Sequence, residues 1–114
     1  MGEWIIEPAT VEALPNILQI EEACFSAPWT RKMLEAELSG NPFANFLVAK
    51  QIPPGEIGSF SIIGYLCFWV VFEEVRLMNL AVIESMQHKG IARALVTQAL
   101  EVGMAQAAMR AVLE

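Results

Sequence analysis

The sequence predicts a mixed α/β fold, in which helices pack on a central mixed, largely antiparallel sheet. Residues 45–50, 58–72 and 75–83 are rich in β-branched and aromatic side chains and are separated by turn-forming segments, as in an antiparallel meander. Segments with helical periodicity flank this region on both sides. The 114 residues suit one domain, and 55% hydrophobic against 18% charged residues is unlike the composition of disordered chains.

The first elements predicted are a strand at residues 4–7 and two helices joined by an elbow. Pro15 suits the first turn of a helix, where its missing N–H costs no hydrogen bond. The elbow at residues 25–29 breaks the helical period, and Thr30 then caps a second helix that Gly40 ends. The inner face of the first helix is formed by Ile17, Leu18, Ile20 and Cys24.

Beyond the meander, residues 90–105 have the periodicity of a helix and residues 111–114 the apolar character of a strand. The turn between the last two strands of the meander is expected at Glu73 and Glu74. A strand–helix–strand crossover normally returns parallel to its first strand. We therefore expect residues 1–114 to form a single domain that is truncated after the start of its fifth strand.

Charge and composition argue against several classes of protein. A net charge of −6 opposes affinity for a phosphate backbone, so no nucleic-acid partner is expected. The apolar run at residues 57–72 is too short to span a bilayer as a helix, and no signal peptide opens the chain, which predicts a soluble, cytoplasmic protein. Cys24 and Cys67 lie far apart and His88 is the single histidine, so no disulfide framework or metal site is predicted.

The segment most informative about function is a strand, tight loop and helix at residues 80–95. Backbone N–H groups without partners and the helix dipole make a helix N-terminus an anion site. Gly90 and Ala92 leave room for a ligand there, and His88, Lys89 and Arg93 place cations at the positive end, where they are unfavourable unless an anion binds. An equally weighted alternative is that these three side chains are simply solvated and that their position lowers the stability only slightly.

This loop reads Gln-x-x-Gly-x-Ala, as Gln87, Gly90 and Ala92. It resembles the pyrophosphate loop of the GNAT superfamily of acyl-CoA-dependent N-acetyltransferases. Residues 79–82 (NLAV), residues 21–30 (EEACFSAPWT) and the terminal Leu113-Glu114 are similar to segments of its RimI type, the ribosomal-protein-alanine N-acetyltransferases, in the same order and spacing. The resemblance implies the GNAT fold over residues 1–114, with the last helix and hairpin of the family absent.

The resemblance also implies a cofactor site with acetyl-CoA as co-substrate. In GNAT enzymes the strand before the loop pairs with the pantetheine arm, and the loop amides hold the pyrophosphate. The carry-over assigns pantetheine contacts to Leu80, Ala81 and Val82. It assigns pyrophosphate contacts to the backbone of Gln87, His88, Lys89, Gly90, Ile91 and Ala92, with charge added by Lys89 and Arg93.

The catalytic and acceptor residues rest on the same resemblance. The base of the RimI type corresponds to Glu114, and Glu74 is the second candidate carboxylate, with a solvated turn residue as its alternative. The general acid of this type is a tyrosine beyond Glu114. The side chains of Phe25, Pro28 and Trp29 would line the acceptor-peptide groove, although an aromatic elbow that packs two helices explains them equally well.

The sequence therefore predicts an N-acetyltransferase that transfers the acetyl group of acetyl-CoA to the N-terminal α-amine of a protein, such as a ribosomal protein, with activity impaired in this short chain. The alternative is a non-catalytic GNAT module that acts through protein–protein interaction or forms a homodimer through the uncovered sheet.

Overall fold

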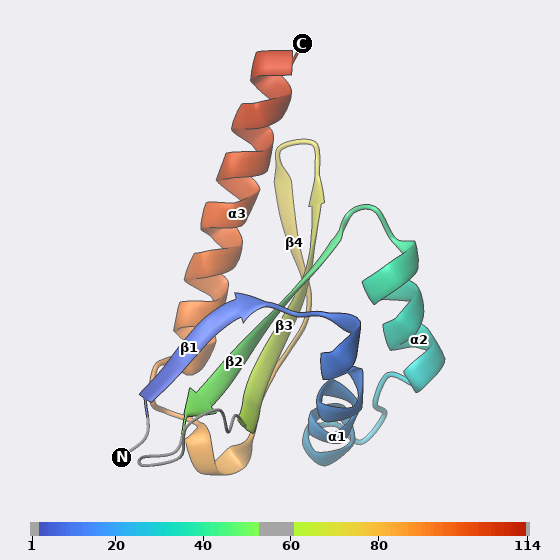
Figure 1. The fold of residues 1–114 in the computed structure, drawn as a ribbon, viewed down its shortest axis with the longest axis vertical. Coiled ribbons are helices and arrows are strands. Elements are labelled where there is room, and N and C mark those ends of the chain that lie inside the picture. Colours follow the sequence, from blue (N-terminus) through green and yellow to red (C-terminus); the bar gives the residue numbers. More distant parts are fainter. Residues whose placement is uncertain (1–2, 53–60, 114) are drawn as a thin grey trace.

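The computed structural model describes residues 3–52 and 61–113. Their helices and strands follow one another along the chain in nearly the order that the sequence predicts (Figure 1). The elements are β1 (Glu3–Pro8), the 3-10 turn η1 (Val11–Ala13), α1 (Leu14–Cys24), α2 (Arg31–Glu35), the π-helical segment η2 (Ala36–Gly40), β2 (Ala44–Ile52), β3 (Ser61–Val71), β4 (Glu74–Val82), the 3-10 turn η3 (Glu84–Met86) and α3 (Ile91–Leu113).

The strands form one four-stranded sheet in the order β1-β2-β3-β4, and each neighbouring pair is antiparallel, which confirms the predicted meander. The hairpin between β3 and β4 turns at Phe72 and Glu73, one residue earlier than predicted, because Val71 pairs with Glu74. β2 continues two residues past the predicted end at Lys50, and the start of the strand predicted from residue 58 lies outside the described residues.

Hydrophobic side chains fill both faces of this sheet, since successive strand residues point to opposite faces. On one face, Ile17 and Ile20 of α1 and Leu34 of α2 pack against Tyr65 and Cys67 of β3. On the other face, α3 is buried through Ile91, Leu95 and Ala99, with Val102 partly buried beside them. Figure 1 shows α3 and the pair α1–α2 on opposite sides of the strands.

The predicted strand at residues 111–114 is wrong, because α3 continues through Leu113. Residues 104–113 (MAQAAMRAVL) are dominated by strong helix formers and contain neither proline nor glycine, so nothing in them ends the helix. Consequently the described part of the sheet contains no parallel pairing. Across residues 3–52 and 61–113, no helix combines the length and apolar character needed to cross a membrane.

Candidate functional site

The predicted anion loop borders a hollow of about 380 Å³ between the end of β4 and the start of α3. The chain leaves the sheet at Val82, makes the short turn η3, and enters α3 at Ile91. The residues that line the hollow come from these consecutive segments: Val82, Met86, Gln87, His88, Gly90, Ile91, Ala92 and Arg93. The structure thus gathers most of the predicted cofactor-binding residues around one cavity.

Two backbone conformations with positive φ shape this loop. His88 has φ of 63° and Gly90 has φ of 84°, values that favour glycine and cost a residue with a side chain about 1–2 kcal/mol. The Gly90 carbonyl accepts the first helical hydrogen bond, from Ala94 N–H at 3.0 Å. A Cβ at Gly90 would meet no atom within 4 Å, so the space in front of the helix end is open.

Positive charge surrounds this helix end. The first N–H groups of an α-helix have no partner inside the helix and carry the positive end of its dipole. The side chains of His88, Lys89 and Arg93 are exposed here, and none of them forms an ion pair within the described part of the chain. Backbone donors and cations together favour a ligand with several negative charges.

The carbonyl of Val82 connects β4, the loop and α1. It accepts a hydrogen bond from Gln87 Nε2 at 3.0 Å, and the Cys24 Sγ lies 3.7 Å from the same oxygen. Burial, followed by the negative charges of Glu21 and Glu84, raises the pKa of the Cys24 thiol, which therefore stays protonated and donates. The Gln87 side chain thus fixes the loop to the end of β4.

β4 is an edge strand, so the backbone groups on its outer side have no strand partner among residues 3–52 and 61–113. Its register against β3 shifts between Leu77 and Asn79, which leaves Met78 as the extra residue of a β-bulge. Ala81 and Val82 are buried and Leu80 is half-buried, so this strand offers a ligand its backbone edge.

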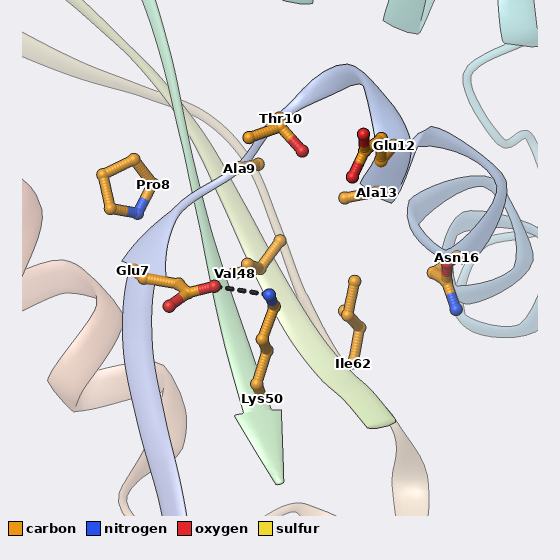
Figure 2. A pocket seen from close by; sticks show the side chains of 10 residues that line it. All are labelled: Glu7, Pro8, Ala9, Thr10, Glu12, Ala13, Asn16, Val48, Lys50 and Ile62. Atoms are coloured by element: carbon orange, nitrogen blue, oxygen red, sulfur yellow. Dashed lines mark ion pairs between the residues drawn. The ribbon is translucent and has the colours of Figure 1, made fainter. Parts of the chain in front are cut away.

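A second hollow, of about 190 Å³, lies where β1 leads into η1 (Figure 2). It contains the carboxylates of Glu7 and Glu12, and its single amine, Lys50, forms an ion pair with Glu7. Figure 2 shows that ion pair between side chains of the neighbouring strands β1 and β2. Because its charge is predominantly negative, this hollow suits a polyanion less well than the β4–α3 loop.

The predicted acceptor residues lie on the elbow between α1 and α2. Phe25 and Trp29 are half-buried and pack against the core on the α1 side of the sheet, and Pro28 is half-buried between them in the chain. Packing of the aromatic elbow is therefore confirmed. Contact with an acceptor stays a prediction.

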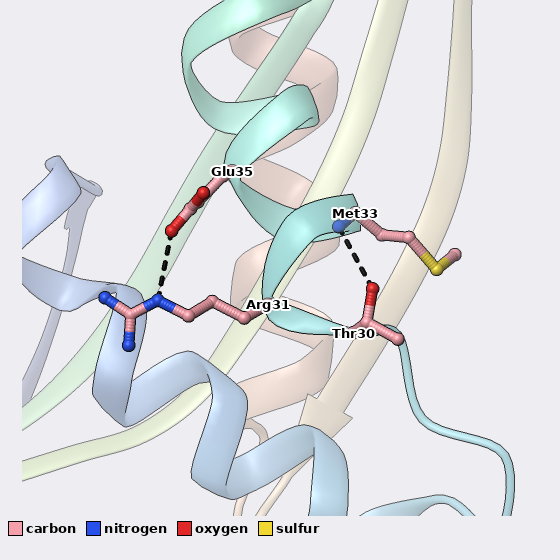
Figure 3. Close-up of polar contacts among 4 residues, drawn as sticks. All are labelled: Thr30, Arg31, Met33 and Glu35. Atoms are coloured by element: carbon pink, nitrogen blue, oxygen red, sulfur yellow. Dashed lines mark hydrogen bonds and ion pairs between the residues drawn. The ribbon is translucent and has the colours of Figure 1, made fainter.

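The start of α2 is fixed by local polar contacts (Figure 3). The Thr30 Oγ1 accepts a hydrogen bond from Met33 N–H at 3.2 Å, so the predicted cap is confirmed. One turn further, Arg31 and Glu35 form an exposed ion pair at 3.0 Å. Both contacts lie within residues 30–35, so they define where α2 begins.

Sequence reasoning missed a buried polar cluster beneath the elbow. The Glu21 side chain is 1% exposed and accepts hydrogen bonds from Trp29 N–H at 2.8 Å, from the Tyr65 hydroxyl and from Asn79 Nδ2. Burial and the hydrogen bond to Glu21 raise the pKa of Tyr65. The spacing of Glu21 from the buried Ile17 indicates that it lies on the inner face of α1, but its partners are far apart in the sequence.

Glu74, one of the two candidate catalytic carboxylates, does not lie at the loop. Glu74 lies at the hairpin end of β4, is exposed and forms an ion pair with Arg76 at 2.9 Å. Eight residue steps of about 3.3 Å place it roughly 26 Å along the strand from Val82. Glu114 lies outside the described residues.

Metal ligands do not gather in the described part of the chain. No group of three or more His, Cys, Asp or Glu side chains is placed to hold a metal ion there. Both cysteines are free thiols.

Comparison with known proteins gives consistent matches. A family model described as "Acetyltransferase (GNAT) family" matches residues 14–114. A Bacillus subtilis (strain 168) protein, provisionally named ribosomal protein bS18-alanine N-acetyltransferase, is 27% identical over 104 residues, which cover 91% of this chain and 64% of the relative.

Two solved structures are similar in fold. The crystal structure of the ribosomal-protein-S18-alanine N-acetyltransferase from Escherichia coli has a TM-score of 0.75 at 20% identity, covering 91% of this chain and 61% of that one. Arabidopsis thaliana NAA60 in complex with acetyl-CoA has a TM-score of 0.71 at 17% identity, covering 88% of this chain and 67% of that one. The chain thus spans less than two thirds of the two bacterial relatives.

Proposed function

Because this chain belongs to the GNAT acetyltransferase family, we propose that it binds acetyl-CoA at the β4–α3 loop and transfers the acetyl group to the N-terminal α-amine of a protein. The observation that carries the proposal is the overlap of the family's pyrophosphate motif with the cationic hollow at the N-terminus of α3. Similarity to the ribosomal-protein-alanine acetyltransferases supports a ribosomal protein as the acceptor.

In the proposed binding mode, two sets of backbone groups bind two different parts of coenzyme A. The pyrophosphate would accept hydrogen bonds from the N–H groups between Gln87 and Ala92, with Lys89 and Arg93 as counter-charges. The pantetheine arm carries amides, and the free edge of β4 at Leu80, Ala81 and Val82 offers N–H and C=O groups that pair with amides. The acyl end would then extend along β4 toward Asn79.

The proposed reaction is attack of a neutral α-amine on the thioester carbonyl, with departure of the coenzyme A thiolate. It requires a base for the amine proton and an acid for the thiolate. Glu114 is our candidate base. Glu74 remains a weaker candidate, because it forms an ion pair with Arg76 and lies five residue steps, roughly 16 Å, along β4 from Asn79, toward which the acyl end would extend. Phe25, Pro28 and Trp29 are proposed to line the acceptor groove.

Calorimetric titration with acetyl-CoA tests the cofactor site. Gly90→Glu places a side chain and a negative charge in the open space before α3, and we expect micromolar binding by the wild type to be lost in this variant. Gly40→Glu is the matched control, since Gly40 also has nothing within 4 Å of its Cβ position and lies in η2, outside the loop. Equal affinity in all three proteins would contradict the proposed site.

A second candidate function is self-association through the free edge of β4. Leu77 and Met78 on this edge strand are 48% and 37% exposed, and Phe72 at the hairpin is 79% exposed. Concentration-dependent dimerisation in sedimentation experiments, without affinity for acetyl-CoA, would favour a non-catalytic interaction module. A monomer that binds acetyl-CoA would favour the enzyme.

A further inference from the structure

The buried Glu21 carboxylate has no role in the function proposed above, although a buried charge is costly unless it is fully hydrogen-bonded. The side chain is 1% exposed, and the described residues contain no buried side-chain nitrogen or oxygen without a partner. Several groups therefore donate hydrogen bonds to this one carboxylate. Such an arrangement is strong where it is complete and fixes the elements that supply its donors.

The donors come from three separate parts of the fold. One carboxylate oxygen accepts from the Trp29 backbone N–H at 2.8 Å, which belongs to the elbow. The other accepts from the hydroxyl of Tyr65 on β3 and from the amide of Asn79 on β4. Asn79 Nδ2 also lies 2.7 Å from the Tyr65 hydroxyl, so the two strand residues contact each other as well.

This cluster links the proposed acceptor side of the site to the proposed cofactor side. Trp29 follows Phe25 and Pro28 on the elbow, whereas Asn79 directly precedes Leu80, Ala81 and Val82 on β4. Asn79 also lies next to the β-bulge at Met78, a feature that re-aims neighbouring side chains and is frequent beside active sites.

We propose that Glu21 is a positioning residue for the acceptor amine: its carboxylate holds the Trp29 elbow at a fixed place over Asn79, beside the edge of β4. This inference rests on the proposed function, and it predicts that removing the charge loosens the elbow while leaving the phosphate loop intact. Loss of one hydrogen bond to a charged group corresponds to about a tenfold change in an equilibrium constant.

The test uses Glu21→Gln, which keeps the shape of the side chain but presents an amide N–H₂ to donors that need an acceptor. Tyr65→Phe is the second variant, because it removes one strand donor and leaves the Trp29 contact in place. The matched control is Glu37→Gln. Glu37 also accepts two hydrogen bonds, from Asn41 at 2.9 Å and Trp69 at 3.0 Å, and links η2 to β3.

Three quantities are measured on each 114-residue protein: hydrogen exchange of the Trp29 amide by NMR, the Kd of acetyl-CoA, and the Kd of an alanine-initiated hexapeptide in the presence of coenzyme A. For Glu21→Gln we expect about tenfold faster exchange at Trp29 and about tenfold weaker peptide binding, with the Kd of acetyl-CoA changed less than twofold. Tyr65→Phe should change the same two quantities in the same direction by less, and Glu37→Gln should leave them unchanged.

The inference is overturned if the Trp29 exchange rate and the peptide Kd of both cluster variants match the wild type, or if Glu37→Gln changes them equally. Accelerated exchange throughout the molecule, including Leu95 in α3, together with lost acetyl-CoA affinity would also overturn it, because that pattern marks general destabilisation. If the wild type binds acetyl-CoA but no peptide, the role of Glu21 in positioning the acceptor is refuted, while the proposed cofactor site stands. If it binds no acetyl-CoA, the proposed function fails, and the exchange rate at Trp29 still decides whether Glu21 holds the elbow.

Discussion

Gly64 is the residue at which a single added methyl group should disturb both stability and the cofactor site. It is buried in β3 and pairs with Val82 at the end of β4. A Cβ at this position would lie 3.0 Å from the carbonyl oxygen of Ala81 and 3.2 Å from a methyl group of Val82. Ordinary contacts begin at 3.4 Å, so the oxygen must move by about 0.4 Å and the methyl by about 0.2 Å.

The atom closest to the added Cβ is the backbone oxygen of Ala81, which cannot avoid the contact by a side-chain rotation. Overpacking of this kind costs about 1–3 kcal/mol, and replacing glycine returns about 0.4–1 kcal/mol by restricting the unfolded chain. Gly64→Ala should therefore lower the free energy of unfolding by about 1–2 kcal/mol and the Tm by about 4–8 °C. Because Ala81 and Val82 carry the displacement, the affinity for acetyl-CoA should fall as well.

Urea and thermal unfolding followed by circular dichroism measure the stability change. Gly40→Ala is the control, because its Cβ would meet nothing within 4 Å and should leave the protein as stable as the wild type or slightly more so. Measured against Val82→Ala alone, Gly64→Ala should cost less than it does in the wild type but should still be destabilising, since the clash with the Ala81 oxygen remains. A Gly64→Ala protein as stable as Gly40→Ala would show that a Cβ at position 64 is accommodated without strain, contrary to this prediction.

Three other substitutions have directions set by the structure. Burial raises the pKa of the Cys67 thiol from 9.0 to about 12. The protonated thiol therefore contributes its full stabilisation below pH 9.0, and this contribution is lost as the pH rises toward 12. In Cys67→Ala, the free energy of unfolding measured with urea should fall less steeply with pH across this range, by about 1.4 kcal/mol per pH unit. His88→Gly removes strain at φ of 63° and should raise the free energy of unfolding by up to about 1 kcal/mol. Thr30→Ala removes the cap of α2 and should lower it by about 1 kcal/mol, measured in the same way.

Local signals in the sequence located most elements of the fold. Pro15 falls in the first turn of α1, Thr30 caps α2, and Gly40 ends the helical segment that follows it, because each residue acts through its own backbone or a neighbour three positions away. The strands were found for the same reason, since their content of β-branched and aromatic residues is a local property. The end of α3 was missed because the apolar residues 111–113 suit a strand and a buried helix alike.

The same distinction between local and long-range signals applies to the site. The loop from Gln87 to Arg93 is one continuous segment, so its motif predicted the hollow that the structure forms. The Glu21 cluster was not predictable, because Tyr65 and Asn79 lie 44 and 58 residues away in the sequence and meet Glu21 only when the sheet forms. Glu74 was predicted in the turn before β4, one residue from its observed place as the first residue of that strand, and its distance from the loop depends on the length and direction of the strand.

We propose above all that acetyl-CoA binds along the end of β4 and at the start of α3. The most direct measurement is the change in backbone amide chemical shifts of the 114-residue protein on titration with acetyl-CoA. We expect the largest changes at residues 80–82 and 87–93, with little change at Glu74 or around the Glu7–Lys50 ion pair. Changes concentrated at the β1–η1 hollow, or none at residues 87–93, would contradict it.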